Sequence, residues 1–175
     1  MSEKANAITF KGSGLTLVGN QVTVGQKAPD FTAVADDMSA ATFSTYRGQG
    51  KVVIISSVPS LDTPVCDTQT RRFNEESAKL GDDVTVLTIS VDLPMAQKRW
   101  CGAVSATNIT TLSDYKDHQF GQAYGLYIKE LGLLARAVLV VDKTGSITHY
   151  DLVSEVTHEP DYAAAISAAK VALSL

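Results

Sequence analysis

The sequence predicts an α/β fold in which a β-α-β unit is followed by a β-β-α unit, with a β-hairpin added in front. Three observations support this prediction: short β-branched runs typical of buried strands, helix-start signals between them, and a hairpin signal in the last third. A length of 175 residues with 45% hydrophobic residues suits one domain, and no low-complexity or linker segment divides it. We therefore expect a single domain over residues 1–175, with about 1–24 as the hairpin extension.

The first elements follow in order along the chain. AITFKGSGLTLVG alternates apolar and polar residues around KGSG, which predicts a β-hairpin. KVVIISSV (51–58) predicts a buried strand, and a helix is expected from Pro64 to about Leu80. DVTVLTISVD predicts a second buried strand, and a short helix beginning near Pro94 carries Cys101 close to its end.

The remaining elements complete the pattern. ARAVLVVDKTGSITHYDLV predicts two strands joined at DKTG, and EPDYAAAISAAKVAL predicts a terminal helix that starts near Pro160 and Asp161. This order of strands and helices is the thioredoxin arrangement. The segment from Thr107 to Leu134 stays ambiguous: TNITTLSD suits a short strand, DHQFGQAYG suits a helical turn, and LYIKELGLL has no clear period.

Composition limits the function classes. The formal net charge is −4 and the charges are mixed, which argues against nucleic acid or an anionic membrane as the main partner. The N-terminal MSEKANAITF lacks an apolar signal core, and runs such as VVII and AVLVV are too short to span a bilayer, so a cytoplasmic protein is expected. In a reducing cytoplasm, Cys66 and Cys101 are either inert core thiols or a transient redox pair.

Cys66 stands at a predicted helix start. Thr63 is the expected N-cap and Pro64 the first helical residue, so Cys66 falls in the first turn. Free backbone N–H groups and the helix dipole there favour a thiolate. Raising the ionised fraction of an ordinary thiol from ~3% to ~90% at pH 7 requires roughly 3.4 kcal/mol. A helix terminus supplies ~0.3 to 1 kcal/mol and at most ~2, so a cation must supply the rest.

Arginine is the natural candidate for this cation. Arg71 and Arg72 lie five and six positions after Cys66 and do not share its helix face. Arg136 begins an apolar strand, where a charge is more surprising. Two interpretations of Arg136 remain open: a strand-end side chain that reaches solvent, or a guanidinium aimed into a thiolate pocket.

One alternative interpretation and one observation oppose an activated Cys66. The residue could be a small buried hydrophobe with no reactivity. Asp62 and Asp67 are close in sequence, and a carboxylate near the sulfur would disfavour the thiolate, so both are expected to point to solvent.

PSLDTPVC (59–66) matches the Pro-x-x-x-Thr-x-x-Cys motif of peroxiredoxins. The chain most closely resembles the bacterial thiol peroxidase subgroup, the atypical two-cysteine peroxiredoxins. SLDTPVCDTQTRRFN, SVDLPMAQKRWCG, LLARAVLVVD and EPDYAAA look like segments of that subgroup in order. The resemblance covers nearly the whole chain, and it implies a thioredoxin-like peroxiredoxin fold with an N-terminal β-hairpin.

The resemblance also implies catalytic roles. Cys66 would be the peroxidatic cysteine, which attacks the O–O bond of hydrogen peroxide or an alkyl or lipid hydroperoxide and becomes a sulfenic acid. Thr63 would hydrogen-bond the sulfur or the peroxide oxygen, and Pro59 would shield the pocket from bulk water. Arg136 would stabilise the thiolate and polarise the substrate.

Cys101 is too far along the chain from Cys66 to form a Cys-x-x-Cys motif. The resemblance makes it the resolving cysteine, which forms a disulfide with Cys66 that thioredoxin then reduces. The alternative is a core cysteine at a helix end. Two thiols on separate helices are expected to require local unwinding, with Gly102 as a plausible helix terminator and Trp100 as a fluorescent reporter of the change.

Partners and cofactors follow from the same resemblance. A homodimer is expected, and no haem, flavin or metal is required. A zinc site would need Cys66, Cys101 and two of the three histidines, but no paired ligand spacing is present. These histidines (His118, His149 and His158) are expected to be surface or hydrogen-bonded structural residues. A non-enzymatic redox sensor or interaction protein on the same fold remains the alternative function.

Overall fold

The computed structural model describes residues 1–174; Leu175, the end of the predicted domain, lies outside the described residues. Its centre is a seven-stranded sheet in the order β11-β10-β5-β6-β7-β3-β4. Strands β5, β6 and β7 run parallel, and the other neighbours pair antiparallel. The strands are β3 (Thr32–Val34), β4 (Ala40–Thr42), β5 (Val52–Ser57), β6 (Val84–Ser90), β7 (Thr110–Ser113), β10 (Ala137–Val141) and β11 (Ile147–Leu152).

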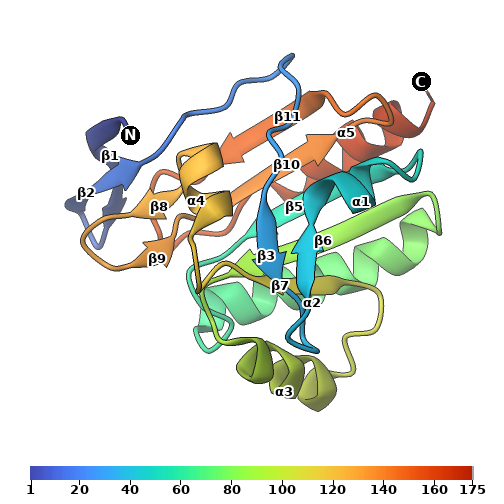
Figure 1. Ribbon diagram of the computed structural model, residues 1–175, viewed down its shortest axis with the longest axis horizontal. Coiled ribbons are helices and arrows are strands. Elements are labelled where there is room, and N and C mark those ends of the chain that lie inside the picture. Colours follow the sequence, from blue (N-terminus) through green and yellow to red (C-terminus); the bar gives the residue numbers. More distant parts are fainter. Residues whose placement is uncertain (175) are drawn as a thin grey trace.

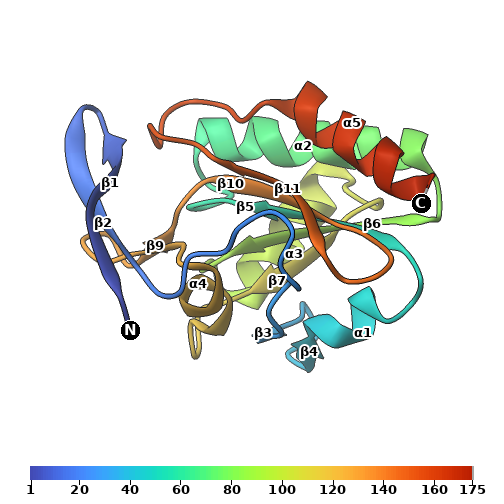
Figure 2. The same ribbon diagram turned by 90° about the horizontal axis from the view of Figure 1, so that it is seen from above.

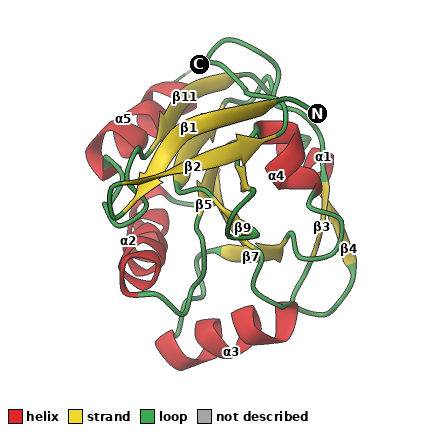
Figure 3. Ribbon diagram, turned by 90° about the vertical axis from the view of Figure 1, so that its left-hand side faces the viewer, coloured by secondary structure: helices red, strands yellow, loops and turns green. Residues whose placement is uncertain are grey.

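Helices cover both faces of this sheet (Figure 1). They are α1 (Phe43–Arg47), α2 (Pro64–Leu80), α3 (Pro94–Val104), α4 (Gln119–Tyr124) and α5 (Tyr162–Leu173). Figure 2 shows α2 and α5 on one side of the sheet and α4 and α1 on the other. Figure 3 places α3 at the end of the molecule away from α5.

The alternation of side chains in β5 explains why both faces need cover. Val52 and Ile54 pack into the hydrophobic cluster under α2 and α5, whereas Val53 and Ile55 pack into the cluster on the opposite face. All four side chains are fully buried. The continuous apolar run in the sequence is therefore a central strand, as predicted.

The N-terminal hairpin is confirmed as β1 (Glu3–Phe10) and β2 (Ser13–Val18), which pair antiparallel. Lys11 and Gly12 form its turn with φ of 48° and 81°, the left-handed values that a tight two-residue hairpin needs. Strand β2 also pairs with β8 (Tyr127–Ile128), which pairs with β9 (Leu133–Leu134). The ambiguous segment thus supplies two short strands of a second, four-stranded sheet.

Both predicted units are present, and two details differ from the prediction. Gly102 does not end its helix: α3 continues to Val104 and stops at Ser105, whose φ of 54° is left-handed. An isolated glycine weakens a helix but does not have to terminate it. Strands β3 and β4 and helix α1 have no counterpart among the elements predicted from the sequence.

No helix within residues 1–174 combines the length and apolar character needed to cross a bilayer.

Candidate active site

Cys66 lies in the first turn of α2, as predicted, and its side chain is fully buried. Pro64 opens the helix after Thr63, whose φ of −115° and ψ of 147° are extended. The sulfur belongs to a small apolar cluster with Val58, Leu61, Trp100 and Ala106. Burial alone suits either an inert or a reactive thiol, so the polar groups that face the sulfur decide between them.

Arg136 faces that sulfur from the residue before β10. Its side chain is 2% exposed, so it does not reach solvent from a strand end. Nη1 and Nη2 both lie 3.5 Å from Sγ of Cys66. Nη1 also donates to Oε1 of Gln69 at 2.9 Å, while Nε and Nη2 donate to the Val156 carbonyl at 3.2 and 2.9 Å. All five guanidinium N–H groups therefore have an acceptor.

The charge of Arg136 has no carboxylate partner among residues 1–174, where the ion pairs are Arg71–Asp67, Lys79–Glu76, Arg99–Asp62 and Lys129–Glu3. A buried cation is costly unless an anion or several dipoles compensate it. Two of the five donors point at the sulfur and three at neutral oxygens. The site is therefore built to accept a negative charge at Cys66.

Gln69 fixes this arrangement, and its role was not predicted from the sequence. Its side chain is fully buried, and Nε2 donates to Oγ of Ser56 at 2.8 Å, which turns Oε1 toward Arg136. Gln69 follows Cys66 by three positions and so shares its helix face; this spacing could have identified it. The Val156 carbonyl carries no sequence signal, because every residue has one.

The loop before α2 contains the other two motif residues. Pro59 is buried and Thr63 is exposed. The Thr63 hydroxyl neither caps the helix nor bonds the sulfur; it donates to the Ser60 carbonyl at 2.8 Å. The expected N-cap is thus correct in position but wrong in its side-chain bond. The hydroxyl oxygen keeps lone pairs that can accept a hydrogen bond from an incoming donor.

Asp92, which follows β6, holds this loop and also escaped sequence reasoning. Its Oδ1 accepts from Oγ of Ser60 at 2.6 Å, and its Oδ2 accepts from the Leu61 N–H at 2.8 Å and from Oγ of Ser90 at 2.7 Å. These hydrogen bonds tie the loop to the end of a central strand. The backbone just before Cys66 is therefore held in place.

Cys101 lies near the end of α3 and is half-buried, and both cysteines are free thiols. It packs against the same apolar cluster that contains Cys66. Burial raises the pKa of the Cys101 thiol, while a hydrogen bond to Thr111, with 3.8 Å between Sγ and Oγ1, acts in the opposite direction. In the folded helix Cys101 is thus held as a neutral thiol.

The two acidic neighbours differ from expectation in one respect. Asp62 is exposed, with 67% of its side chain accessible, and pairs loosely with Arg99 at 3.6 Å. Asp67 does not simply point to solvent: Oδ2 accepts from Nε of Arg71 at 2.8 Å, and Oδ1 accepts from Nε1 of Trp100 at 2.9 Å. Both oxygens are engaged, and the carboxylate charge is balanced by Arg71.

None of the three histidines is a hydrogen-bond partner of Arg136 in the described chain. His158 is exposed, whereas His118 and His149 are half-buried. Nδ1 of His118 and Nε2 of His149 are buried without a hydrogen-bond partner in the described chain, so the expectation of hydrogen-bonded histidines is wrong for these two atoms. Among residues 1–174, no group of three or more His, Cys, Asp or Glu side chains could hold a metal ion.

Comparison with known proteins gives consistent matches. The family model described as Redoxin matches residues 23–166. The chain is 56% identical over 167 residues to a thiol peroxidase of Halalkalibacterium halodurans, with 95% of this chain and 99% of the relative covered. It is 55% identical over 163 residues to a thiol peroxidase of Bacillus subtilis, covering 93% and 96% of the two chains.

Solved structures agree with the sequence matches. A peroxiredoxin-like protein from Aquifex aeolicus superposes with a TM-score of 0.87 at 38% identity, covering 96% of this chain and 98% of that chain. A thiol peroxidase from Chromobacterium violaceum has a TM-score of 0.81 at 18% identity, covering 95% and 94% of the two chains. At that low identity, the second match concerns the fold alone.

Proposed function

The chain belongs to the redoxin family, and on that premise we propose that Cys66 is the nucleophile with which it reduces hydroperoxides. The chain is an enzyme, a peroxidase of the peroxiredoxin type with a thioredoxin-like fold. The observation that carries the assignment of Cys66 is the Arg136 guanidinium, buried without a carboxylate partner in residues 1–174, with two nitrogens 3.5 Å from the sulfur.

The first step follows from this geometry. The Cys66 thiolate attacks one peroxide oxygen, so that an S–O bond forms and the O–O bond breaks. The attacked oxygen stays on the sulfur as a sulfenic acid, and the other leaves as an alkoxide or hydroxide that takes up a proton. Arg136 stabilises the thiolate before attack and the developing negative charge on the leaving oxygen during it.

Pro59 and Thr63 complete the proposed site. Pro59 is buried in the loop before α2 and would exclude bulk water from the sulfur. Thr63 is exposed, and its hydroxyl oxygen would accept a hydrogen bond from the peroxide O–H while its own O–H continues to donate to the Ser60 carbonyl. The Thr63 hydrogen bond would thereby orient the substrate along the line of attack.

Cys101 is the proposed resolving cysteine. Its thiol attacks the sulfenic sulfur; an S–S bond forms, the S–O bond breaks and water leaves. Each cysteine lies within a regular helix, and Cys66 is fully buried, so we propose that the first turn of α2 and the end of α3 unwind for this step. A dithiol protein, which the family resemblance suggests is thioredoxin, then reduces the disulfide to two thiols.

The remaining proposals concern context. We propose that residues 1–175 act as a single domain, with about 1–24 as an N-terminal extension, that the chain forms a homodimer, and that it works in the cytoplasm. The reaction draws its electrons from the two thiols and the external dithiol. Its chemistry therefore needs no bound cofactor.

The test is steady-state consumption of a hydroperoxide in the presence of thioredoxin, thioredoxin reductase and NADPH. Wild type is expected to turn over many times, whereas one slow stoichiometric oxidation would favour the redox sensor. Cys66→Ser is expected to abolish the reaction with peroxide. Cys101→Ser is expected to form the sulfenic acid but lose thioredoxin-supported turnover, and normal turnover of this variant would overturn the resolving role.

A further inference from the structure

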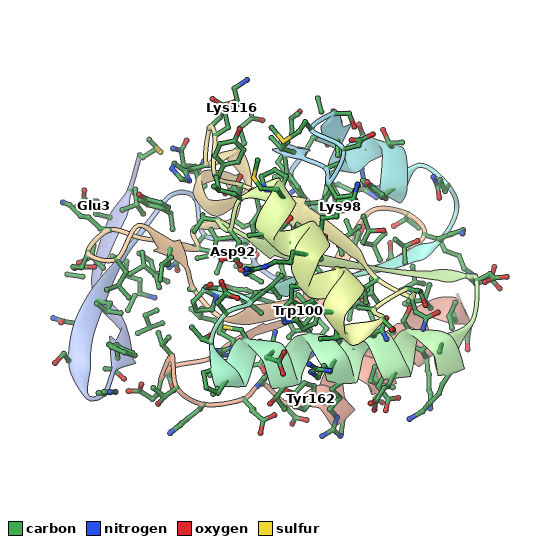
Figure 4. All side chains as sticks on the ribbon, turned by 90° about the horizontal axis from the view of Figure 1, so that it is seen from below. Glu3, Asp92, Lys98, Trp100, Lys116 and Tyr162 are labelled. Atoms are coloured by element: carbon green, nitrogen blue, oxygen red, sulfur yellow. The ribbon has the colours of Figure 1, made fainter. Side chains whose placement is uncertain are left out.

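A cluster of three side chains joins the two cysteine-bearing helices. Asp67 of α2 accepts from Nε1 of Trp100 of α3 at 2.9 Å and from Nε of Arg71 at 2.8 Å. The Arg71 guanidinium in turn lies over the Trp100 ring, 5.8 Å from its centroid. Figure 4 shows Trp100 between α3 and α2. One contact between the helices thus combines an ion pair, a hydrogen bond and a cation–π interaction.

Both ends of this contact adjoin a cysteine in the chain. Asp67 follows Cys66, and its N–H donates to the Thr63 carbonyl at 2.9 Å in the first turn of α2. Trp100 precedes Cys101, is only 8% exposed, and packs in the apolar cluster that contains Cys66. Unwinding either cysteine segment therefore displaces one partner of the Asp67–Trp100 hydrogen bond.

We propose that this hydrogen bond is a latch that holds both cysteine segments folded and so sets the rate at which Cys101 resolves the Cys66 sulfenic acid. Asp67 and Trp100 are positioning residues in this account, because they act by keeping the two cysteine segments folded. The inference rests on the proposed function: resolution forms the Cys66–Cys101 bond and releases water only after the latch opens. Breaking the latch raises the population of the unwound state.

The latch has a second consequence. While it is closed, the sulfenic acid remains in the peroxide site beside Arg136, where a second hydroperoxide can convert it to a sulfinic acid and leave as water or an alcohol. Resolution and this second oxidation compete for the same intermediate. A weaker latch therefore gives faster disulfide formation and less irreversible oxidation.

The chain offers a matched control for the latch. Asp62, in the loop before α2, pairs with Arg99 of α3 at 3.6 Å, but both side chains are mostly exposed. Such exposed pairs contribute little. Asp62→Asn therefore removes an ionic contact between the same two parts of the chain and leaves the Asp67–Trp100 hydrogen bond in place.

To test this, each reduced protein is mixed with hydroperoxide and the reaction is quenched at set times with a thiol-alkylating agent. The products are then identified by their intact mass. Trp100→Phe removes the donor and keeps an aromatic ring, and Asp67→Ala removes the acceptor and keeps the tryptophan. Loss of a hydrogen bond to the Asp67 carboxylate, which is 34% exposed, is expected to change the equilibrium between the folded and unwound states about fivefold. Each variant is expected to form the disulfide about that much faster.

Three further readouts separate a latch from general destabilisation. For Trp100→Phe, the second-order reaction of Cys66 with hydroperoxide is expected to change by less than about twofold, because the five donors of Arg136 and the charge of Asp67 are untouched. The sulfinic fraction at excess peroxide is expected to fall. The double variant Asp67→Ala/Trp100→Phe is expected to be no faster than either single variant, because both remove the same bond.

Each contrary result has a defined meaning. Disulfide formation at the wild-type rate in both single variants, or an equal acceleration in Asp62→Asn, overturns the latch. Additive effects in the double variant also overturn it, because the two side chains would then act independently. No Cys66–Cys101 disulfide in wild type would instead refute the proposed resolving role, whatever the variants do.

Discussion

At the scale of single residues, the site depends on how the donors of Arg136 are distributed. Two point at the Cys66 sulfur, one at Gln69 and two at the Val156 carbonyl. This fork requires a planar guanidinium, which can reach three acceptors at fixed angles. A lysine would carry the same charge but could not reproduce the geometry.

Arg136→Lys is therefore expected to slow the reaction of Cys66 with hydroperoxide by about 100-fold, the scale seen when one preorganised donor to a developing anion is lost. Stopped-flow kinetics of the reduced protein measure this rate constant. Arg99→Lys, on the exposed side of α3, is the control and is expected to react at the wild-type rate. Retention of the wild-type rate in Arg136→Lys would show that charge alone suffices.

Gln69 gives a sharper test, because its replacement can be nearly isosteric. Gln69→Glu places a carboxylate beside the guanidinium and offers it a competing counter-ion, so the cation no longer favours the thiolate alone. We expect the peroxide rate constant to fall about tenfold while the melting temperature stays close to wild type. A rate equal to wild type would show that a carboxylate at position 69 does not compete with the sulfur for Arg136.

At the scale of elements, helix α3 contains a titratable group, the Cys101 thiol, whose ionisation is disfavoured by burial. Burial raises the pKa of the Cys101 thiol above its ordinary value near 9. Because the folded helix disfavours the thiolate, the stability from this group is fully present below that value and is lost as pH rises above it.

The end of α3 is therefore expected to unwind more readily above about pH 9 than at pH 7. Trp100 fluorescence of the reduced protein, followed against pH, reports the change. Cys101→Ser lacks the titrating group and is expected to show a smaller response. Equal pH responses of the two proteins would assign the effect to another group.

The N-terminal hairpin is held by a second titratable group, Glu155. Its carboxylate accepts from the Thr9 hydroxyl at 2.7 Å and from the N–H groups of Lys11 and Gly12 at 2.9 and 3.2 Å. The Thr9 hydrogen bond is the largest cause that lowers the pKa of Glu155 to about 2. The next residue, Val156, supplies the carbonyl that holds Arg136. The hairpin thus docks beside the backbone that positions the guanidinium.

Because the folded state lowers this pKa, the docking stability is present above the ordinary value near 4.5 and is lost as pH falls toward about 2. Amide hydrogen exchange at Lys11 and Gly12 is expected to accelerate relative to β5 over that range. Glu155→Gln is expected to show the loss already at neutral pH, whereas Glu75→Gln on the exposed side of α2 should behave as wild type. Unchanged protection in Glu155→Gln would contradict this role.

At the scale of the whole molecule, sequence signals predicted the helix starts and turns, which are determined by interactions between neighbouring residues. Thr63 and Pro64 marked the start of α2, and the DKTG turn marked the β10–β11 hairpin, because caps and turns are set by neighbouring residues. Strands β8 and β9 did not show in the sequence, because each has two residues and β8 depends on pairing with the distant β2. The same reasoning covers β3, which pairs with β7.

The residues of the candidate site divide in the same way into those that the sequence predicted and those that it did not. Cys66, Thr63 and Pro59 fall in one motif, and the shortfall in thiolate stabilisation directed attention to a distant cation, which the structure shows to be Arg136 facing the sulfur. Gln69 and Asp92 were missed because their partners come from other parts of the chain. Buried hydrogen-bond networks of this kind become visible only once the tertiary fold is known.

The central claim is that Cys66 is the nucleophile and that Cys101 resolves its oxidised form. The most direct measurement is the intact mass of each protein after one equivalent of hydroperoxide, followed by alkylation of free thiols. We predict a disulfide with no alkylated thiol in wild type, one added oxygen on Cys66 in Cys101→Ser, and no oxidation in Cys66→Ser. Oxidation of Cys66→Ser at the wild-type rate would contradict the account.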